Sequence, residues 1–179
     1  MAYHDFEERH VKQTNKFALQ SCDHFSIPSR NPEVTGNFYE HILGGVEFFR
    51  AGYEGEGKNK HIFYHIGTTL VELGEQEDGR SYADVTNPES RNFNPHWAFG
   101  TTAEGVLHFR DHLQAEAIPF AGPRRHVNVS AVSVYFRDPE GNQLEVTTWE
   151  AFPESEIPAR KLGERIVMWA DLTHNWPPR

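Results

Sequence analysis

Apolar and polar residues alternate in several short runs along the chain, and a helical pattern interrupts these runs twice. CDHFSIP alternates over residues 22–28. NPEVTGNFYEHILGG then opens with an Asn-Pro helix start, places Phe38 and Ile42 at helical spacing, and stops at Gly44-Gly45. VEFFRAGY, KHIFYHIG and TTLVELGE follow as short β-rich runs. The first half of the chain therefore predicts the order strand, helix and three strands, or βαβββ.

The same order recurs between residues 94 and 148. NPHWAFGT predicts a strand, TAEGVLHFRDHLQAEA a helix, and IPFAG, SAVSVYFR and NQLEVTTW three further strands. Repetition of one supersecondary unit indicates that the two copies pack together and share a core. We therefore predict an α+β fold in which two βαβββ modules form a cupped, eight-stranded mixed sheet.

Composition changes along the chain suggest where the modules begin and end. We place the segments at residues 1–21, 22–74, 75–93, 94–149 and 150–179. Residues 22–74 and 94–149 are the two modules, and together they form one domain. Residues 1–21 are a polar arm, and residues 75–93 are a polar linker rich in Pro and Asn. The last is a C-terminal extension with a predicted helix, packed on the domain or on a partner subunit, whose apolar stripe is Leu162, Ile166, Trp169 and Ala170.

Each module carries one histidine and one glutamate at matching places. His24 and His96 lie in the first strands of the two modules, and Glu72 and Glu145 lie in the last strands. Because alternate side chains of a strand point to opposite faces, their large apolar neighbours mostly face the other way. Tyr135 alternates in the same sense. We expect these polar residues to line the cup, while the apolar residues pack on the helices.

Charge and composition then restrict the function. The formal net charge is −9 and no basic run occurs, which argues against a nucleic-acid or membrane-surface partner. The charged start of the chain does not resemble a signal peptide, so a cytoplasmic location is expected. A single cysteine, Cys22, excludes an intrachain disulfide and a thiolate zinc cluster. A small-molecule substrate is the partner that remains.

Two histidines and one carboxylate from different strands are a suitable donor set for a divalent metal. Imidazole and carboxylate bind first-row divalent metals, and three protein ligands leave positions open for substrate. We therefore predict His24, His96 and Glu145 as metal ligands.

The motifs in these modules resemble those of a known superfamily. DHFSI followed by FYEHILGG, then PHWAFGT, and finally YFRDPEGNQLEV are similar to the vicinal oxygen chelate superfamily over about residues 22–149. Its members include glyoxalase I, methylmalonyl-CoA epimerase, fosfomycin-resistance proteins, bleomycin-binding proteins and extradiol ring-cleaving dioxygenases. The resemblance implies one metal enclosed by two modules, and a homodimer.

A second pattern resembles the signature of the extradiol dioxygenases. It consists of His126, Tyr135, the turn Asp-Pro-Glu-Gly and Glu145. This resemblance implies an oxidoreductase that cleaves the ring of a vicinal diol, with Fe(II) as the preferred metal and Mn(II), Ni(II) or Zn(II) as alternatives. His126 and Tyr135 would be catalytic residues acting on the substrate. His61 or His65 would then shuttle the proton.

Three other activities remain open. In a lyase or isomerase of the glyoxalase or epimerase type, Glu72 would be a fourth ligand or would move a proton. In a thiol transferase of the fosfomycin-resistance type, Arg124 and Arg125 could bind an anion, but the acidic segment VTTWEAFPESE after Glu145 disfavours this reading. A metal-free binding protein of the bleomycin type would use the cup as a trap, whereas the retained histidines and glutamates favour an enzyme.

Overall fold

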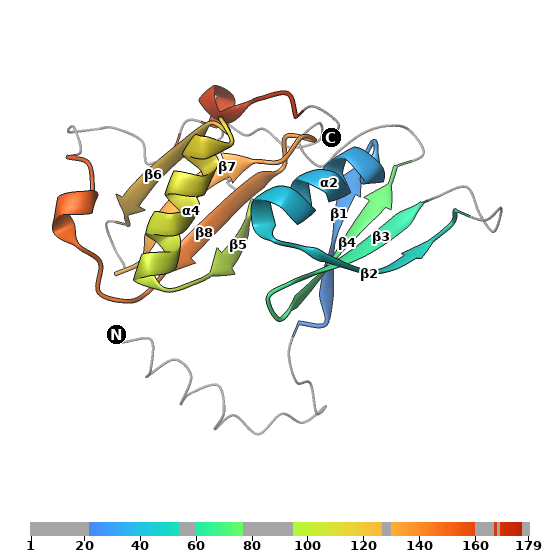
Figure 1. The fold of residues 1–179 in the computed structure, drawn as a ribbon, viewed down its shortest axis with the longest axis horizontal. Helices are drawn as coiled ribbons and strands as arrows, with labels where there is room; N and C mark the ends of the chain where they lie inside the picture. The colour runs from blue at the N-terminus through green and yellow to red at the C-terminus, as the bar shows by residue number, and fades with distance from the viewer. Residues whose placement is uncertain are drawn as a thin grey trace, which may run out of the picture.

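The two predicted modules are both present in the computed structural model, which describes residues 22–53, 60–76, 95–126, 130–159, 167 and 169–176 (Figure 1). The N-terminal arm and most of the predicted linker lie outside these residues. The first module consists of β1 (His24–Ser29), α2 (Pro32–Leu43), β2 (Val46–Ala51), β3 (His61–Ile66) and β4 (Thr69–Glu75). The second module consists of β5 (Trp97–Gly100), α4 (Ala103–Ala115), β6 (Phe120–Arg125), β7 (Val132–Arg137) and β8 (Gln143–Thr148).

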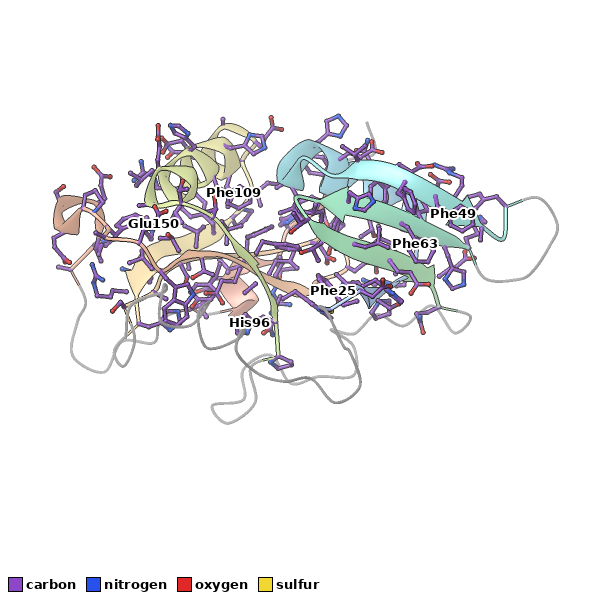
Figure 2. All side chains as sticks on the ribbon, turned by 90° about the horizontal axis from the view of Figure 1, so that it is seen from below. Phe25, Phe49, Phe63, His96, Phe109 and Glu150 are labelled. Carbon is purple, nitrogen blue, oxygen red and sulfur yellow. The ribbon has the colours of Figure 1, made fainter. Side chains whose placement is uncertain are left out.

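The eight strands form two four-stranded mixed sheets. Their strand orders are β1-β4-β3-β2 and β5-β8-β7-β6, so the second sheet repeats the topology of the first. In each sheet the first strand is parallel to the last strand of its module, and the other pairs are antiparallel. The predicted α+β fold of two βαβββ modules is therefore confirmed. Both helices lie on the same side of the sheets, and we call the opposite side of each sheet its open face (Figure 2).

Local sequence signals explain where helix α2 begins and ends. The Asn31 side chain accepts a hydrogen bond from the Val34 amide, and Pro32 occupies the first turn, where no amide donor is needed. Gly44 ends the helix with a φ of 65°, a conformation that favours glycine. Helix α4 starts in a similar way, because Thr102 accepts from the Gly105 amide.

One hydrophobic core runs through both modules. Phe38 of α2 lies 6.4 Å from Phe136 of β7, measured between ring centroids. On the first strands, the Phe25 and Trp97 rings stack at 6.1 Å. Because aromatic pairs at such distances contribute beyond their buried area, these contacts fix the two modules against each other.

The turn between β7 and β8 also joins the modules. The Glu140 side chain is only 6% exposed, and its Oε1 accepts hydrogen bonds from Ser29 Oγ, the Arg30 and Asn31 amides and Thr35 Oγ1. Its Oε2 lies 2.7 Å from Arg30 Nε. A turn of the second module therefore binds the start of helix α2 in the first.

The described part of the C-terminal extension contains two short 3-10 turns, η1 (Glu154–Glu156) and η2 (Trp169–Leu172). The predicted helix falls partly on residues 160–166 and 168, which lie outside the described residues. Leu172 packs on Tyr135, and Trp176 packs edge-on against Phe38 at 5.2 Å. The extension thus passes from the open face of the second module to helix α2. Among the described residues, no helix has both the length and the apolar character that a membrane crossing requires.

Candidate metal site

The register of the second sheet brings the predicted residues of that module together. Glu145 is the Cα partner of both Ala98 and Tyr135, so these three side chains share the open face. His96 precedes β5 and alternates in step with Ala98. It projects on the side opposite the helices (Figure 2).

His96 and Glu145 form a close pair at this face. His96 Nε2 lies 2.6 Å from Glu145 Oε2, and the Glu145 side chain is 6% exposed. Burial by itself would raise the pKa of Glu145, but hydrogen bonds from His126, His96 and Ser133 together hold the pKa well below its usual range. The carboxylate is therefore ionised at neutral pH. An imidazole and an ionised carboxylate side by side are donors that suit a divalent first-row metal.

Hydroxyl groups and a second histidine surround this pair. His126 Nε2 lies 2.8 Å from Tyr135 Oη, 3.2 Å from Ser133 Oγ and 3.7 Å from Glu145 Oε1. Ser133 Oγ is also 2.9 Å from Thr147 Oγ1. Burial, followed by the charge of Glu145, raises the pKa of Tyr135 well above its usual value, so the phenol keeps its proton and can donate it.

The first module has the same topology but different pairs. His24 Nδ1 lies 2.8 Å from Asp23 Oδ1, and Glu72 Oε1 lies 2.6 Å from His61 Nδ1. His24 therefore does not join His96 and Glu145 within the chain. Among the described residues, no three histidine, cysteine, aspartate or glutamate side chains converge closely enough to hold a metal. The structure thus brings together two of the three predicted ligands.

A cavity of about 580 Å³ lies beside the second-module residues. It opens between the β3–β4 turn and the ends of β5 and β8, and Thr101, Thr147 and Trp149 contribute to its wall. Since Thr147 also bonds Ser133, the cavity adjoins the network around His126. It has room for a small organic molecule.

Sequence reasoning did not identify every residue near the site. His61 and His65 were both candidates for a proton shuttle, whereas of these two the structure pairs His61 with Glu72. Nothing in the sequence predicted that Leu172 packs on Tyr135, because hydrophobic spacing does not show which face a distant segment covers.

Comparison with known proteins agrees with this topology. A family profile described as the Glyoxalase/Bleomycin resistance protein/Dioxygenase superfamily matches residues 21–146. The metallothiol transferase FosB of Shouchella clausii (strain KSM-K16) is 30% identical over 131 residues, which cover 73% of this chain and 81% of FosB.

Two solved structures illustrate the shared fold. A mutant of the fosfomycin resistance protein FosX from Listeria monocytogenes, complexed with Mn(II) and 1S,2S-dihydroxypropylphosphonic acid, has a TM-score of 0.56 and 19% identity, with 77% of this chain and 96% of that chain covered. A glyoxylase/bleomycin resistance protein/dioxygenase domain from Frankia sp. EAN1pec has a TM-score of 0.60 and 19% identity, with 74% and 94% covered.

These relatives correct the predicted activity. FosB is named a metallothiol transferase and FosX a fosfomycin resistance protein, and neither is a ring-cleaving dioxygenase, so the prediction of an extradiol dioxygenase, and with it of an oxidoreductase, is wrong. The Asp-Pro-Glu-Gly turn within the motif that suggested it has a structural role, because Asp138 accepts from the Glu140 and Asn142 amides and shapes the turn. Such a turn does not select an activity. These relatives also give no support for iron, whereas the FosX structure contains Mn(II).

Proposed function

Because the chain belongs to the Glyoxalase/Bleomycin resistance protein/Dioxygenase superfamily, we propose that it is a metal-dependent enzyme that joins a nucleophile, either a thiol or water, to a small oxygenated anion. The observation that carries this proposal is the His96–Glu145 pair, a buried ionised carboxylate and an imidazole 2.6 Å apart on the open face. The name of FosB, a metallothiol transferase, supports a thiol as the nucleophile. The superfamily resemblance expected from the sequence is confirmed.

The metal would be held by His96 and Glu145 of one copy and by His24 of a second copy. His24 lies on the open face of the first module, where its side chain is 44% exposed and its ring meets the edge of Phe63. Since a single chain leaves His24 away from the other two ligands, a homodimer supplies the third donor. When bound, the metal polarises an oxygen of the substrate and makes the adjoining carbon electrophilic.

The residues around the pair suit an anionic substrate. Arg124 is the Cα partner of Ser133, so both occupy the open face of the second sheet. Arg125 alternates to the other face, where it pairs with Glu154. The cation that the sequence seemed to lack after Glu145 therefore lies on β6, before it, on the same face as Ser133. Tyr135, which keeps its proton, can donate to a substrate oxygen.

The test uses the full chain, Mn(II), fosfomycin and L-cysteine. We expect about one Mn(II) per chain and a metal-dependent product whose mass equals fosfomycin plus cysteine, or fosfomycin plus water. His96→Ala and Glu145→Ala should lose both the metal and the product. Stoichiometric Mn(II) in His96→Ala would overturn the assignment of the site.

The contribution of a second copy is tested by mixing two inactive variants. A heterodimer of His24→Ala and His96→Ala chains would contain one site with both substitutions and one intact site. Unfolding and refolding the mixture should therefore restore metal binding that neither variant has alone. If each ligand set came from one chain, the mixture would stay metal-free.

A further inference from the structure

A histidine–carboxylate pair outside the proposed ligand set lies on the open face of the first module. His61 Nδ1 is 2.6 Å from Glu72 Oε1, and the two side chains are 36% and 15% exposed. A carboxylate oxygen accepts hydrogen bonds, so Nδ1 carries the proton and donates it. The Nε2 atom is then left with a lone pair, as in a general base whose tautomer is fixed by a neighbouring acid.

The pair shares its face with His24. Glu72 is the Cα partner of both Ser26 and Phe63, and the Phe63 ring lies 6.2 Å from the His24 ring. His61 and Ser26 border the same gap, because a Cβ built at Gly74 would lie 3.6 Å from His61 Nδ1 and 3.7 Å from Ser26 Oγ. Glycine at this position therefore leaves space between the imidazole and the hydroxyl.

The two modules differ at this point despite their common topology. In the second module, Ser133 and Thr147 are Cα partners, as His61 and Gly74 are in the first. Ser133 is thus the counterpart of His61, and it bonds Glu145 through a small hydroxyl while Glu145 also pairs with His96. In the first module, His61 forms a hydrogen bond with Glu72, and His24 pairs with Asp23. The second module therefore carries two of the proposed metal ligands, whereas the first carries, besides His24, a pair that is arranged to move a proton.

We propose that His61 is the general base of the reaction and that Glu72 is the residue that positions it. This inference rests on the proposed function, because it places the open face of one copy's first module over the second module of its partner. Nε2 of His61 takes the proton of a thiol, and the sulfur forms a bond to an epoxide carbon as the carbon–oxygen bond breaks. The oxygen keeps the bonding electrons and receives a proton from the imidazolium, which returns His61 to its starting state.

The test compares variants of the full chain with Mn(II), fosfomycin and L-cysteine. His61→Ala should bind Mn(II) in full and keep KM within a few fold, while kcat falls by about 10²–10⁴-fold, the usual contribution of a positioned base. Added imidazole should restore part of kcat in His61→Ala. Glu72→Gln should also lower kcat, and imidazole should not restore it, because His61 still fills the site. His65→Ala, four residues along the same strand and exposed, is the matched control and should be unchanged.

Loss of Mn(II) in His61→Ala would make His61 a ligand and would overturn the proposal, as would an unchanged kcat. His61→Gln, which keeps a polar side chain, distinguishes a folding defect from a lost base.

A readout independent of turnover is acylation of histidine by diethyl pyrocarbonate, followed by mass spectrometry. His61 should react faster than His65, and Glu72→Gln should slow His61 alone. If fosfomycin is not turned over, the proposed function fails while this reactivity still decides whether His61 is an oriented base; equal rates at both histidines would refute it.

Discussion

Removing the Glu140 carboxylate should destabilise the junction between the modules more than any other single surface-turn substitution in the described chain. Glu140 lies in a turn, yet its side chain is 6% exposed and accepts from four donors at Oε1 and from Arg30 Nε at Oε2. The substitution Glu140→Ala leaves these donors without their common acceptor.

The size of the loss follows from what each donor can bond afterwards. Ser29 Oγ and Thr35 Oγ1 keep each other at 2.9 Å, and the Asn31 amide keeps Ser29 Oγ at 3.1 Å. The Arg30 side chain is 47% exposed and can return to water. The Arg30 amide loses its acceptor, which costs about 1–3 kcal/mol when the group is buried. Loss of a negative charge at the start of helix α2 adds about 0.3–1 kcal/mol. We therefore expect Glu140→Ala to lower the free energy of unfolding by about 3 kcal/mol, near the lower end for a broken buried ion pair.

Urea unfolding at a fixed protein concentration measures this change, since a dimer makes the midpoint depend on concentration. Glu140→Gln keeps one carbonyl oxygen and should lose about half as much, since neutral hydrogen bonds are roughly half as strong as charge-assisted ones. The control is Glu33→Ala, which removes an exposed carboxylate from the first turn of the same helix and breaks its surface pair with Arg50. Surface pairs contribute about 0–1 kcal/mol. If Glu140→Ala and Glu33→Ala lowered the free energy equally, the turn would not join the modules in the way described.

Three further perturbations test the packing. Gly36→Ala should destabilise the fold by about 1–3 kcal/mol despite the better helix propensity of alanine, because the new Cβ would overlap the Tyr64 hydroxyl and force that buried ring to move; the urea midpoint measures this. Trp176→Ala should cost about 3–5 kcal/mol as a buried aromatic, whereas Trp149→Ala, at an exposed position, should cost under about 1 kcal/mol; equal costs would mean that the C-terminal extension does not pack as described. Burial raises the pKa of Asp138 to about 7, so the native state keeps a proton that the unfolded chain has released above its ordinary pKa of about 4. Stability should therefore fall as pH rises from about 4 to about 7 and then stay constant, and Asp138→Asn should lack this slope in urea midpoints measured across that range.

The order of the elements could be predicted because each module repeats strong local signals. Asn31-Pro32 at the start of α2 and Gly44 at its end act within a few residues, and both are observed as caps. Alternation in β7 also identified the apolar face opposite Tyr135, since Val132, Val134 and Phe136 are fully buried in the core. Division into two sheets was not predictable, because hydrogen-bond partners between distant strands leave no local pattern.

The candidate site was predictable only within one module. His96 and Glu145 lie on neighbouring strands of one sheet, and alternation is sufficient to place both on the open face. His24 belongs to the other sheet, and its distance from His96 depends on how the modules pack, which spacing along the chain does not determine. The pairing of His61 with Glu72, and of His24 with Asp23, was also hidden, because the register between strands leaves no local pattern in the sequence.

The two open faces differ in a way that bears on the proposed second copy. In the second sheet, every residue of β7 is buried, partly because Leu172 covers Tyr135. In the first sheet, β2 leaves Val46, Phe48 and Phe49 exposed at 66%, 64% and 54%. Covering such side chains is worth about 1.5–3 kcal/mol each when burial is complete. Phe49 lies 5.8 Å from Phe63, which in turn meets His24, so these exposed side chains favour a partner over that face. A second copy of the chain that covers these side chains would also bring its His96 and Glu145 to His24.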